Sequence, residues 1–180
     1  MTFLVAAAGC LEVAAPTGPT SPDVRRIDAP PGSELVATCI PSGLERCFDA
    51  LDNNCDGIID EGCGLSTGLI QFTVAWPEAE TDVDLDVRGP LESDDPARFV
   101  RDRDCPSDGC YGQNVENMFL ADGRLRRGVY VVTIRLASAA ADRVSEPLAI
   151  RLSGRIGQRH YTTEVTLDGK HEERELRFEL

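Results

Sequence analysis

Hydrophobic and polar residues alternate along the chain from Leu69 to its C-terminus, which is the period of a strand with one buried face. In residues 69–76 the side chains expected to face inward are Ile70, Phe72, Val74 and Trp76, and the outward ones are Gln71, Thr73 and Ala75. In residues 82–87 the inward set is Val83, Leu85 and Val87, and the outward set is Asp82, Asp84 and Asp86. Six further segments have strand patterns: 97–102, 115–120, 128–136, 147–154, 160–167 and 173–180.

Turn sequences separate these segments, among them Gly89-Pro90 and Asp168-Gly169. Seven or eight short strands at this spacing, with no amphipathic helix of any length, predict a mainly β chain. We therefore expect residues 68–180 to form an antiparallel, Ig-like β-sandwich. Gly128-Val129-Tyr130, which opens one strand segment, resembles a tyrosine corner.

The N-terminal third has a different pattern. Residues 11–37 are dominated by Pro, Gly, Thr and Ser without a hydrophobic period, which predicts a flexible, disordered tether. Residues 1–10, MTFLVAAAGC, form a short apolar run that resembles a bacterial lipobox. The resemblance implies a truncated lipoprotein signal and lipidation of Cys10.

That interpretation predicts a lipid-anchored protein of the cell envelope, in the outer membrane. The alternatives are a secreted protein, or an ordinary apolar N-terminus with a free Cys10. Because no run of about 20 apolar residues exists, we expect membrane contact through the lipid anchor only.

Charge narrows the range of partners. The 180 residues include 31 acidic and 18 basic ones, a net charge of −13, which repels nucleic acid and anionic lipid and suits divalent cations. The excess is concentrated in residues 38–64, a predicted small module. Between Cys39 and Cys63 the acids are Glu45, Asp49, Asp52, Asp56, Asp60 and Glu61, and the one base is Arg46.

The acids of this module have the spacing of an EF-hand-type calcium loop. Asp52, Asn54, Asp56, Gly57 and Asp60 fall at the first, third, fifth, sixth and ninth positions of such a loop. Ile58 would offer its carbonyl oxygen, and Ile59 would point into a small apolar cluster. Cys63 replaces the usual twelfth-position Glu, so water, Asp49 or Glu61 would complete the site. The expected ligands are Asp52, Asn54, Asp56, Ile58, Asp60 and Glu61.

The seven cysteines predict an oxidising compartment. With Cys10 lipidated, six remain, enough for three disulfides. Cys105 and Cys110 bracket a turn sequence and are expected to pair locally. Cys39, Cys47, Cys55 and Cys63 allow three pairings. Zinc is the alternative for these four thiols, but they lack the close C-x2-C pairs of zinc knuckles.

Two resemblances accompany these patterns. CFDALDNNCDGIIDEGC, residues 47–63, resembles the MopE-type Cys- and Asp-rich metal-binding repeat of bacterial surface proteins, which implies metal binding on a secreted surface. The copper site of that group is not implied, because its residues have no match here. Residues 69–180 resemble an uncharacterised bacterial surface domain with DxDLHV and GYGPENI motifs. Asp84 and Asp86 match its paired aspartates, residues 111–117 match its turn, and its usual His before Val87 is absent.

Asp84 and Asp86 suggest a second cation site on one strand face, with Asp104 as a third ligand. Other acids or amides that could converge on this edge are Asp102, Asp108, Asn114 and Glu116. The alternative is a solvated polar face. His160 and His171 are too isolated in sequence to suggest a transition-metal site.

A GxSxG motif at Gly64–Gly68 matches the nucleophile elbow of α/β-hydrolases, but it lies between a cysteine-rich loop and a strand, so we interpret it as a hinge. The sequence therefore predicts a non-enzymatic, calcium-binding cell-envelope lipoprotein, a structural or adhesive module whose surface ligand is a protein or polysaccharide. The alternative is a carbohydrate- or protein-binding accessory domain of an envelope hydrolase system. One Trp and three Tyr are few for a sugar-stacking platform.

Overall fold

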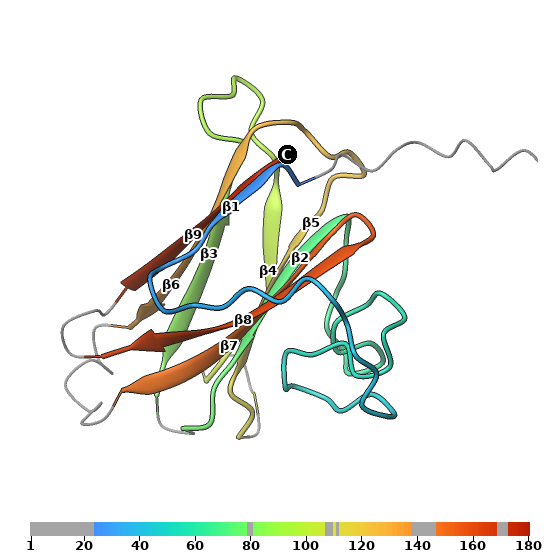
Figure 1. Cartoon of the computed structure of the whole chain (residues 1–180), viewed down its shortest axis with the longest axis vertical. Coiled ribbons are helices and arrows are strands. Elements are labelled where there is room, and N and C mark those ends of the chain that lie inside the picture. Colours follow the sequence, from blue (N-terminus) through green and yellow to red (C-terminus); the bar gives the residue numbers. More distant parts are fainter. Residues whose placement is uncertain (1–23, 79–80, 107–109, 111, 138–146, 169–172) are drawn as a thin grey trace, which may run out of the picture.

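The computed structural model describes residues 24–180 except 79–80, 107–109, 111, 138–146 and 169–172. The described residues form nine strands and no helix, arranged as two antiparallel sheets packed face to face (Figure 1). The strands are β1 (Arg26–Asp28), β2 (Ile70–Ala75), β3 (Val83–Arg88), β4 (Phe99–Asp104), β5 (Val115–Leu120), β6 (Val129–Leu136), β7 (Leu148–Ile156), β8 (Arg159–Leu167) and β9 (Glu173–Glu179). The predicted β-sandwich is confirmed.

One sheet has the strand order β1-β9-β6-β3 and the other the order β4-β5-β2-β7-β8. Their facing sides carry the alternating hydrophobic residues, so the core is a layer between the sheets. The ring of Phe72 on β2 lies 5.2 Å, centroid to centroid, from that of Phe178 on β9. A Cβ on Gly154 of β7 would lie 2.6 Å from the Phe72 ring, so the small residue makes room for this contact.

The tyrosine corner predicted at the start of β6 is present. The Tyr130 hydroxyl donates a hydrogen bond to the carbonyl oxygen of Arg126 at 2.7 Å, and the side chain is almost fully buried. It ties the loop before β6 to the strand itself.

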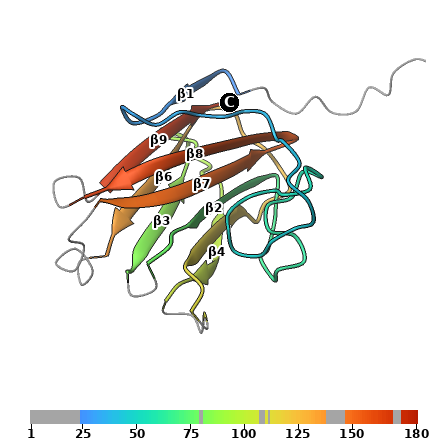
Figure 2. The ribbon, with the colours of Figure 1, turned by 60° about the horizontal axis from the view of Figure 1, so that its bottom comes forward.

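Part of the segment predicted as a tether is folded. β1 pairs with β9, Ile27 opposite Phe178, and Val36 exchanges two backbone hydrogen bonds of 2.8 Å with Thr162 of β8. Figure 2 shows this segment running from the edge of one sheet to the edge of the other. It closes one open side of the sandwich. Composition misses it because the three residues of β1 are too few for their alternation to stand out from the surrounding Pro- and Gly-rich segment. The predicted tether at 11–23 and lipidation at Cys10 lie outside the described residues.

The outer face of the second sheet is covered. β2 is buried along its whole length, including the outward-facing Gln71 and Thr73, and Asn117 of β5 is buried beside them. Gln71 and Thr73 both hydrogen-bond to Oδ1 of Asn117, at 3.1 and 2.8 Å. The alternation in β2 was predicted correctly, but a second part of the chain shields its outer face from solvent.

Candidate metal centre

The covering part is the cysteine-rich module, residues 38–64, which lies against the second sheet (Figure 1, teal). Two disulfides hold it together, Cys39–Cys55 and Cys47–Cys63, each joining residues 16 apart. The third disulfide joins Cys105 and Cys110, as predicted. With all four module cysteines in disulfides, their thiols are not free to bind zinc.

A turn at residues 48–50 is built around Asp60. The Asp60 carboxylate accepts hydrogen bonds from the backbone N–H groups of Phe48 (2.6 Å), Asp49 (3.3 Å) and Ala50 (3.2 Å). Phe48 and Ala50 have positive φ angles, and the turn directs its N–H groups toward the carboxylate. Burial raises the pKa of Asp60 to about 6 even though these hydrogen bonds oppose the rise.

The first half of the predicted calcium loop is a series of tight turns. Asp52 accepts from the N–H groups of Asp56 at 3.1 Å and Gly57 at 2.9 Å, and Asn54 Oδ1 accepts from Asp56 at 2.8 Å. Gly57 has φ of 105°, a conformation that favours glycine, as its position in the loop predicts. The exposed Asp56 accepts from the N–H of Ile58 at 3.0 Å.

Three carboxylates converge in the middle of the module. Glu45, Asp52 and Glu61 each offer an oxygen, and these atoms lie within 4.8 Å of one another. Both oxygens of Glu45 accept backbone N–H groups, from Asn53 at 2.9 Å and Asp60 at 3.1 Å, which fixes the carboxylate in place. Burial raises the pKa of Glu45 to about 7, and the nearby charges of Glu61 and Asp60 contribute to the rise.

Glu61 gives this cluster an unsatisfied atom. Its Oε1 accepts a hydrogen bond from Asn54 Nδ2, whereas its buried Oε2 has no hydrogen-bond partner among the described residues. A buried carboxylate oxygen without a donor is costly, and a bound cation would satisfy it. The residues present therefore fit an oxygen-preferring ion such as Ca²⁺.

The structure divides the five expected ligands that would bind through their side chains. Asp52 and Glu61 are in the cluster, and Asn54 contacts it through its hydrogen bond to Glu61. Asp60 faces the turn at residues 48–50, and Asp56 is exposed and bonded to Ile58.

Sequence reasoning missed Glu45 as a candidate ligand. Glu45 and Glu61 each precede by two residues a cysteine of the Cys47–Cys63 disulfide, so this pairing places them side by side. The spacing would have revealed Glu45 only if the pairing were known.

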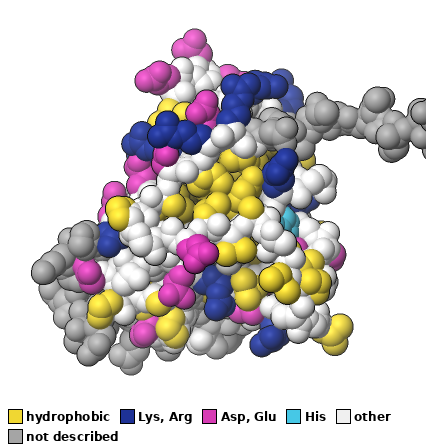
Figure 3. Space-filling model, in the orientation of Figure 1, with side chains coloured by type: hydrophobic (Ala, Val, Ile, Leu, Met, Phe, Trp, Pro, Cys, Tyr) yellow, Lys and Arg dark blue, Asp and Glu magenta, His cyan; other side chains and the backbone are white. Residues whose placement is uncertain are grey.

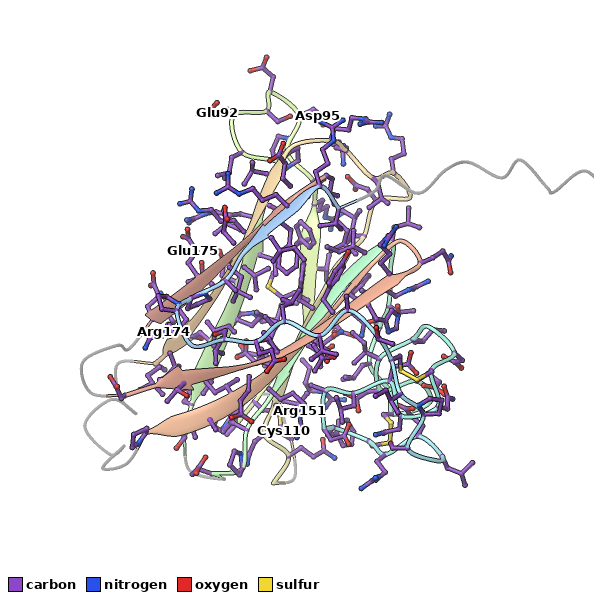
Figure 4. All side chains as sticks on the ribbon, in the orientation of Figure 1. Glu92, Asp95, Cys110, Arg151, Arg174 and Glu175 are labelled. Carbon is purple, nitrogen blue, oxygen red and sulfur yellow. A yellow bond between two sulfur atoms is a disulfide. The ribbon has the colours of Figure 1, made fainter. Side chains whose placement is uncertain are left out.

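Side chains of the sandwich hold the module in place. Arg151 of β7, labelled in Figure 4, donates from Nη1 to the carbonyl oxygen of Asp49 at 2.9 Å. Gln71 Nε2 donates to the carbonyl oxygen of Ile59 at 3.3 Å, and the Ile59 side chain is buried.

His160 of β8 reaches the candidate metal centre itself. Its Nδ1 lies 3.1 Å from Oδ2 of Asp52, and its Nε2 lies 3.0 Å from the carbonyl oxygen of Gly57. The fold thus brings a residue that looked isolated in sequence to a cluster carboxylate. His171 lies outside the described residues.

The connection between the module and β2 is bonded to the sandwich. The Ser66 N–H donates to Asp102 at 2.5 Å, and the Ser66 carbonyl oxygen accepts from Asn117 at 2.8 Å. Arg155 donates to the Thr67 hydroxyl and to the Gly68 carbonyl oxygen. A Cβ at Gly68 would lie 2.5 Å from the carbonyl oxygen of Leu120, so this glycine is needed for close packing. The predicted hinge is a fixed joint in this structure.

The seam between module and sandwich is partly apolar. A pocket there is lined by Val36, Ile40, Ile59 and Tyr161. Val36 and Ile40 are 45 % and 79 % exposed, and Figure 3 shows hydrophobic side chains at the surface of this face.

The second predicted site has a different composition from the expected one. Asp84 lies with Asp82 and Glu116, each offering an oxygen within 4.8 Å of the others. Asp86 is exposed on β3 and lies outside this group. Asp104 lies 3.4 Å from Nη1 of Arg101.

The comparisons with known proteins concern the module. Residues 37–61 match the family model Cu-binding_MopE, described as "Putative metal-binding motif". The resemblance predicted for this segment is confirmed, whereas the one predicted for residues 69–180 stays a prediction. No curated protein and no solved structure matches the chain. Within the described residues, no helix has the length and apolar character needed to cross a membrane.

Proposed function

We propose that the chain is a non-enzymatic cell-envelope protein whose disulfide-braced module binds calcium as a structural staple. One observation carries the proposal: Glu45, Asp52 and Glu61 place carboxylate oxygens within 4.8 Å of one another. The ion would be held by these three residues, with Asn54 beside them.

The choice of calcium follows from the ligand chemistry. The cluster offers only oxygen atoms, and flexible sets of carboxylate oxygens suit Ca²⁺ better than softer metals. Asp52 is also held by two backbone N–H groups and by His160, so the cluster is partly organised before an ion arrives. The ion would offset two of the three negative charges on carboxylates that otherwise repel one another.

The envelope assignment rests on two features of the chain. Disulfides persist in oxidising compartments, and MTFLVAAAGC resembles a lipobox. A structural or adhesive role at the surface is consistent with a small rigid module docked on a β-sandwich.

Cys10→Ala should release the protein from membranes, because the variant has no sulfur to carry the lipid. Equal partitioning of variant and parent between membrane and soluble fractions would contradict lipid anchoring.

The metal proposal is tested by thermal unfolding of the oxidised protein with and without calcium. At about 100 times the Kd, calcium should add about 2.7 kcal/mol of stability, which raises Tm by roughly 5–10 °C. Glu45→Gln and Glu61→Gln should remove most of that rise because each takes one charge from the cluster.

Asp56→Asn is the matched control in the same loop. Asp56 is exposed and lies outside the three-carboxylate cluster, so this variant should keep the calcium-dependent rise. If Asp56→Asn loses the rise while Glu45→Gln keeps it, the ligands follow the EF-hand spacing and not the cluster. If calcium changes neither Tm nor the heat of titration at millimolar concentration, the module is not a calcium site.

A further inference from the structure

The side of the sandwich opposite β1 is closed by side chains instead of backbone. β3 is an edge strand there, and Glu116 of β5 accepts a hydrogen bond from its Leu85 N–H at 2.6 Å. Arg101 of β4 donates from Nη2 to the Leu85 carbonyl oxygen, also at 2.6 Å. The two side chains from one sheet thus occupy the free backbone edge of the other.

Glu116 is fully buried, and only one of its oxygens is used by this contact. Oε2 accepts from Leu85, while the buried Oε1 has no hydrogen-bond donor among the described residues. Such an oxygen either carries a proton or needs a positive partner, and a bound cation would take the place of the proton. Arg101 does not supply a direct bond, because its Nη1 lies 3.9 Å from Oε2 of Glu116.

The surrounding charges leave a deficit that a divalent ion would fill. Four carboxylates gather at this edge: Asp82, Asp84, Asp104 and Glu116. Two guanidinium groups face them, Arg101 at 3.4–3.9 Å and Arg135, whose Nε lies 3.0 Å from Asp84. Burial raises the pKa of Glu116 to about 9, and its contact with Asp104 contributes to the rise, so Glu116 is protonated near neutral pH. The group then has one negative charge in excess, and a cation that displaces the Glu116 proton would meet two. Burial and the neighbouring acids Asp84 and Asp104 raise the pKa of Asp82, as expected of a carboxylate short of cations.

We propose that Asp82, Asp84 and Glu116 form a second site for a hard divalent cation, calcium being the probe of choice. The ion would link the start of β3 to β5 across the open side of the sandwich, where no backbone ladder between described residues joins the two sheets. This site is independent of the module, since its ligands all belong to the sandwich.

Equilibrium dialysis against calcium, on the oxidised full-length chain, tests the proposal by counting bound ions. Wild type should bind two ions, and Glu116→Gln or Asp82→Asn should bind one. Glu61→Gln in the module should also bind one, and combined with Glu116→Gln it should bind none. Asp86→Asn is the matched control, on the same strand but outside the cluster, and should bind two.

A spectroscopic reading identifies which ion is lost. The indole N–H of Trp76 donates to the carbonyl oxygen of Thr81 at 3.0 Å, next to Asp82, so terbium emission excited through Trp76 should report this site. The emission should fall in Asp82→Asn and Glu116→Gln and persist in Glu61→Gln. Far-ultraviolet circular dichroism checks folding; if Glu116→Gln misfolds, the partly buried Asp82 still provides the test.

Wild-type stoichiometry in both Asp82→Asn and Glu116→Gln would overturn the second site. Loss of an ion in Glu116→Gln together with no loss in Glu61→Gln would support the edge site and contradict the module site instead. The two proposals therefore fail separately.

Discussion

Asp60 acts on the backbone of the module. Its carboxylate accepts three N–H groups from residues 48–50, in a turn where Phe48 and Ala50 have positive φ angles. Its own N–H donates to Glu45, so the same residue supports both the turn and one cluster ligand. A buried charge used this way organises a small module that has little hydrophobic core of its own.

We expect Asp60→Asn to destabilise the module by about 1–3 kcal/mol, because an amide NH₂ group would face the Ala50 N–H in place of an acceptor. Amide hydrogen exchange of residues 48–50 in the calcium-free protein measures the effect as a loss of protection. Asp56→Asn removes the same charge from an exposed position and should change stability by less than about 0.5 kcal/mol. Equal protection in both variants would show that the Asp60 contacts contribute nothing.

For individual residues, the sequence predicted part of the candidate site. Asp52 and Gly57 follow from the spacing of the loop, and the bend at Gly57 is present. Glu45 and His160 could not be found the same way, because a disulfide and the sheet bring them to the site from 7 and 108 residues away from Asp52. Spacing along the chain describes local turns and carries no information on contacts made by folding.

Among the elements, β9, β8 and β3 each have one side covered, and the means differs from strand to strand. β9 is covered by β1, β8 is partly covered at Thr162 by Val36, and β3 is covered by Glu116 and Arg101. The eight longer strands were predictable because each has six or more residues and most of them alternate. β1 was not, since a three-residue strand is stable only when its partner is already in place.

We expect Ile27→Ala to lower the free energy of unfolding by about 1–2 kcal/mol, less than for a fully buried residue, because Ile27 is only partly buried against the core. Urea denaturation measures the loss, and size-exclusion chromatography should show more self-association as the β9 edge becomes available. Arg26→Ala is the control on the same strand, where the exposed ion pair with Asp28 should contribute less than about 0.5 kcal/mol. If the two variants are equally stable, β1 does not protect the sheet.

In the whole molecule, module and sandwich share one continuous interface. The outer-face residues Gln71 and Asn117 are buried beneath the module, and Arg151 and His160 reach into it. The sequence predicts a module and a sandwich, but a hydrophobic pattern cannot show that the polar face of the sandwich is the docking surface of the module. Gln71 donates to the carbonyl oxygen of Ile59 in the module, and Asn117 donates to that of Ser66 in the connection between the module and β2. The Oε1 atom of Gln71 is buried without a hydrogen-bond partner among the described residues.

Because of that interface, we expect calcium binding in the module to stabilise the sandwich as well. Trp76 is buried in the sandwich, so its fluorescence reports sandwich unfolding. If the two units unfold together, calcium should raise two urea midpoints by the same amount. One is the midpoint of the change in Trp76 fluorescence, and the other is the midpoint for the loss of amide protection in the module. Binding energy gained by a folded module then stabilises everything that must unfold with it.

Arg151→Met tests this coupling without touching a proposed ligand. Methionine keeps an apolar stem but cannot donate a hydrogen bond to the Asp49 carbonyl oxygen. The free energy that couples the module to the sandwich should therefore fall by about 1 kcal/mol. We expect the calcium-dependent shift at Trp76 to shrink while the calcium affinity measured by calorimetry stays unchanged. In the wild type, calcium could increase amide protection in the module and leave the urea midpoint of Trp76 fluorescence unchanged. That result would show that the two units unfold independently despite their shared interface.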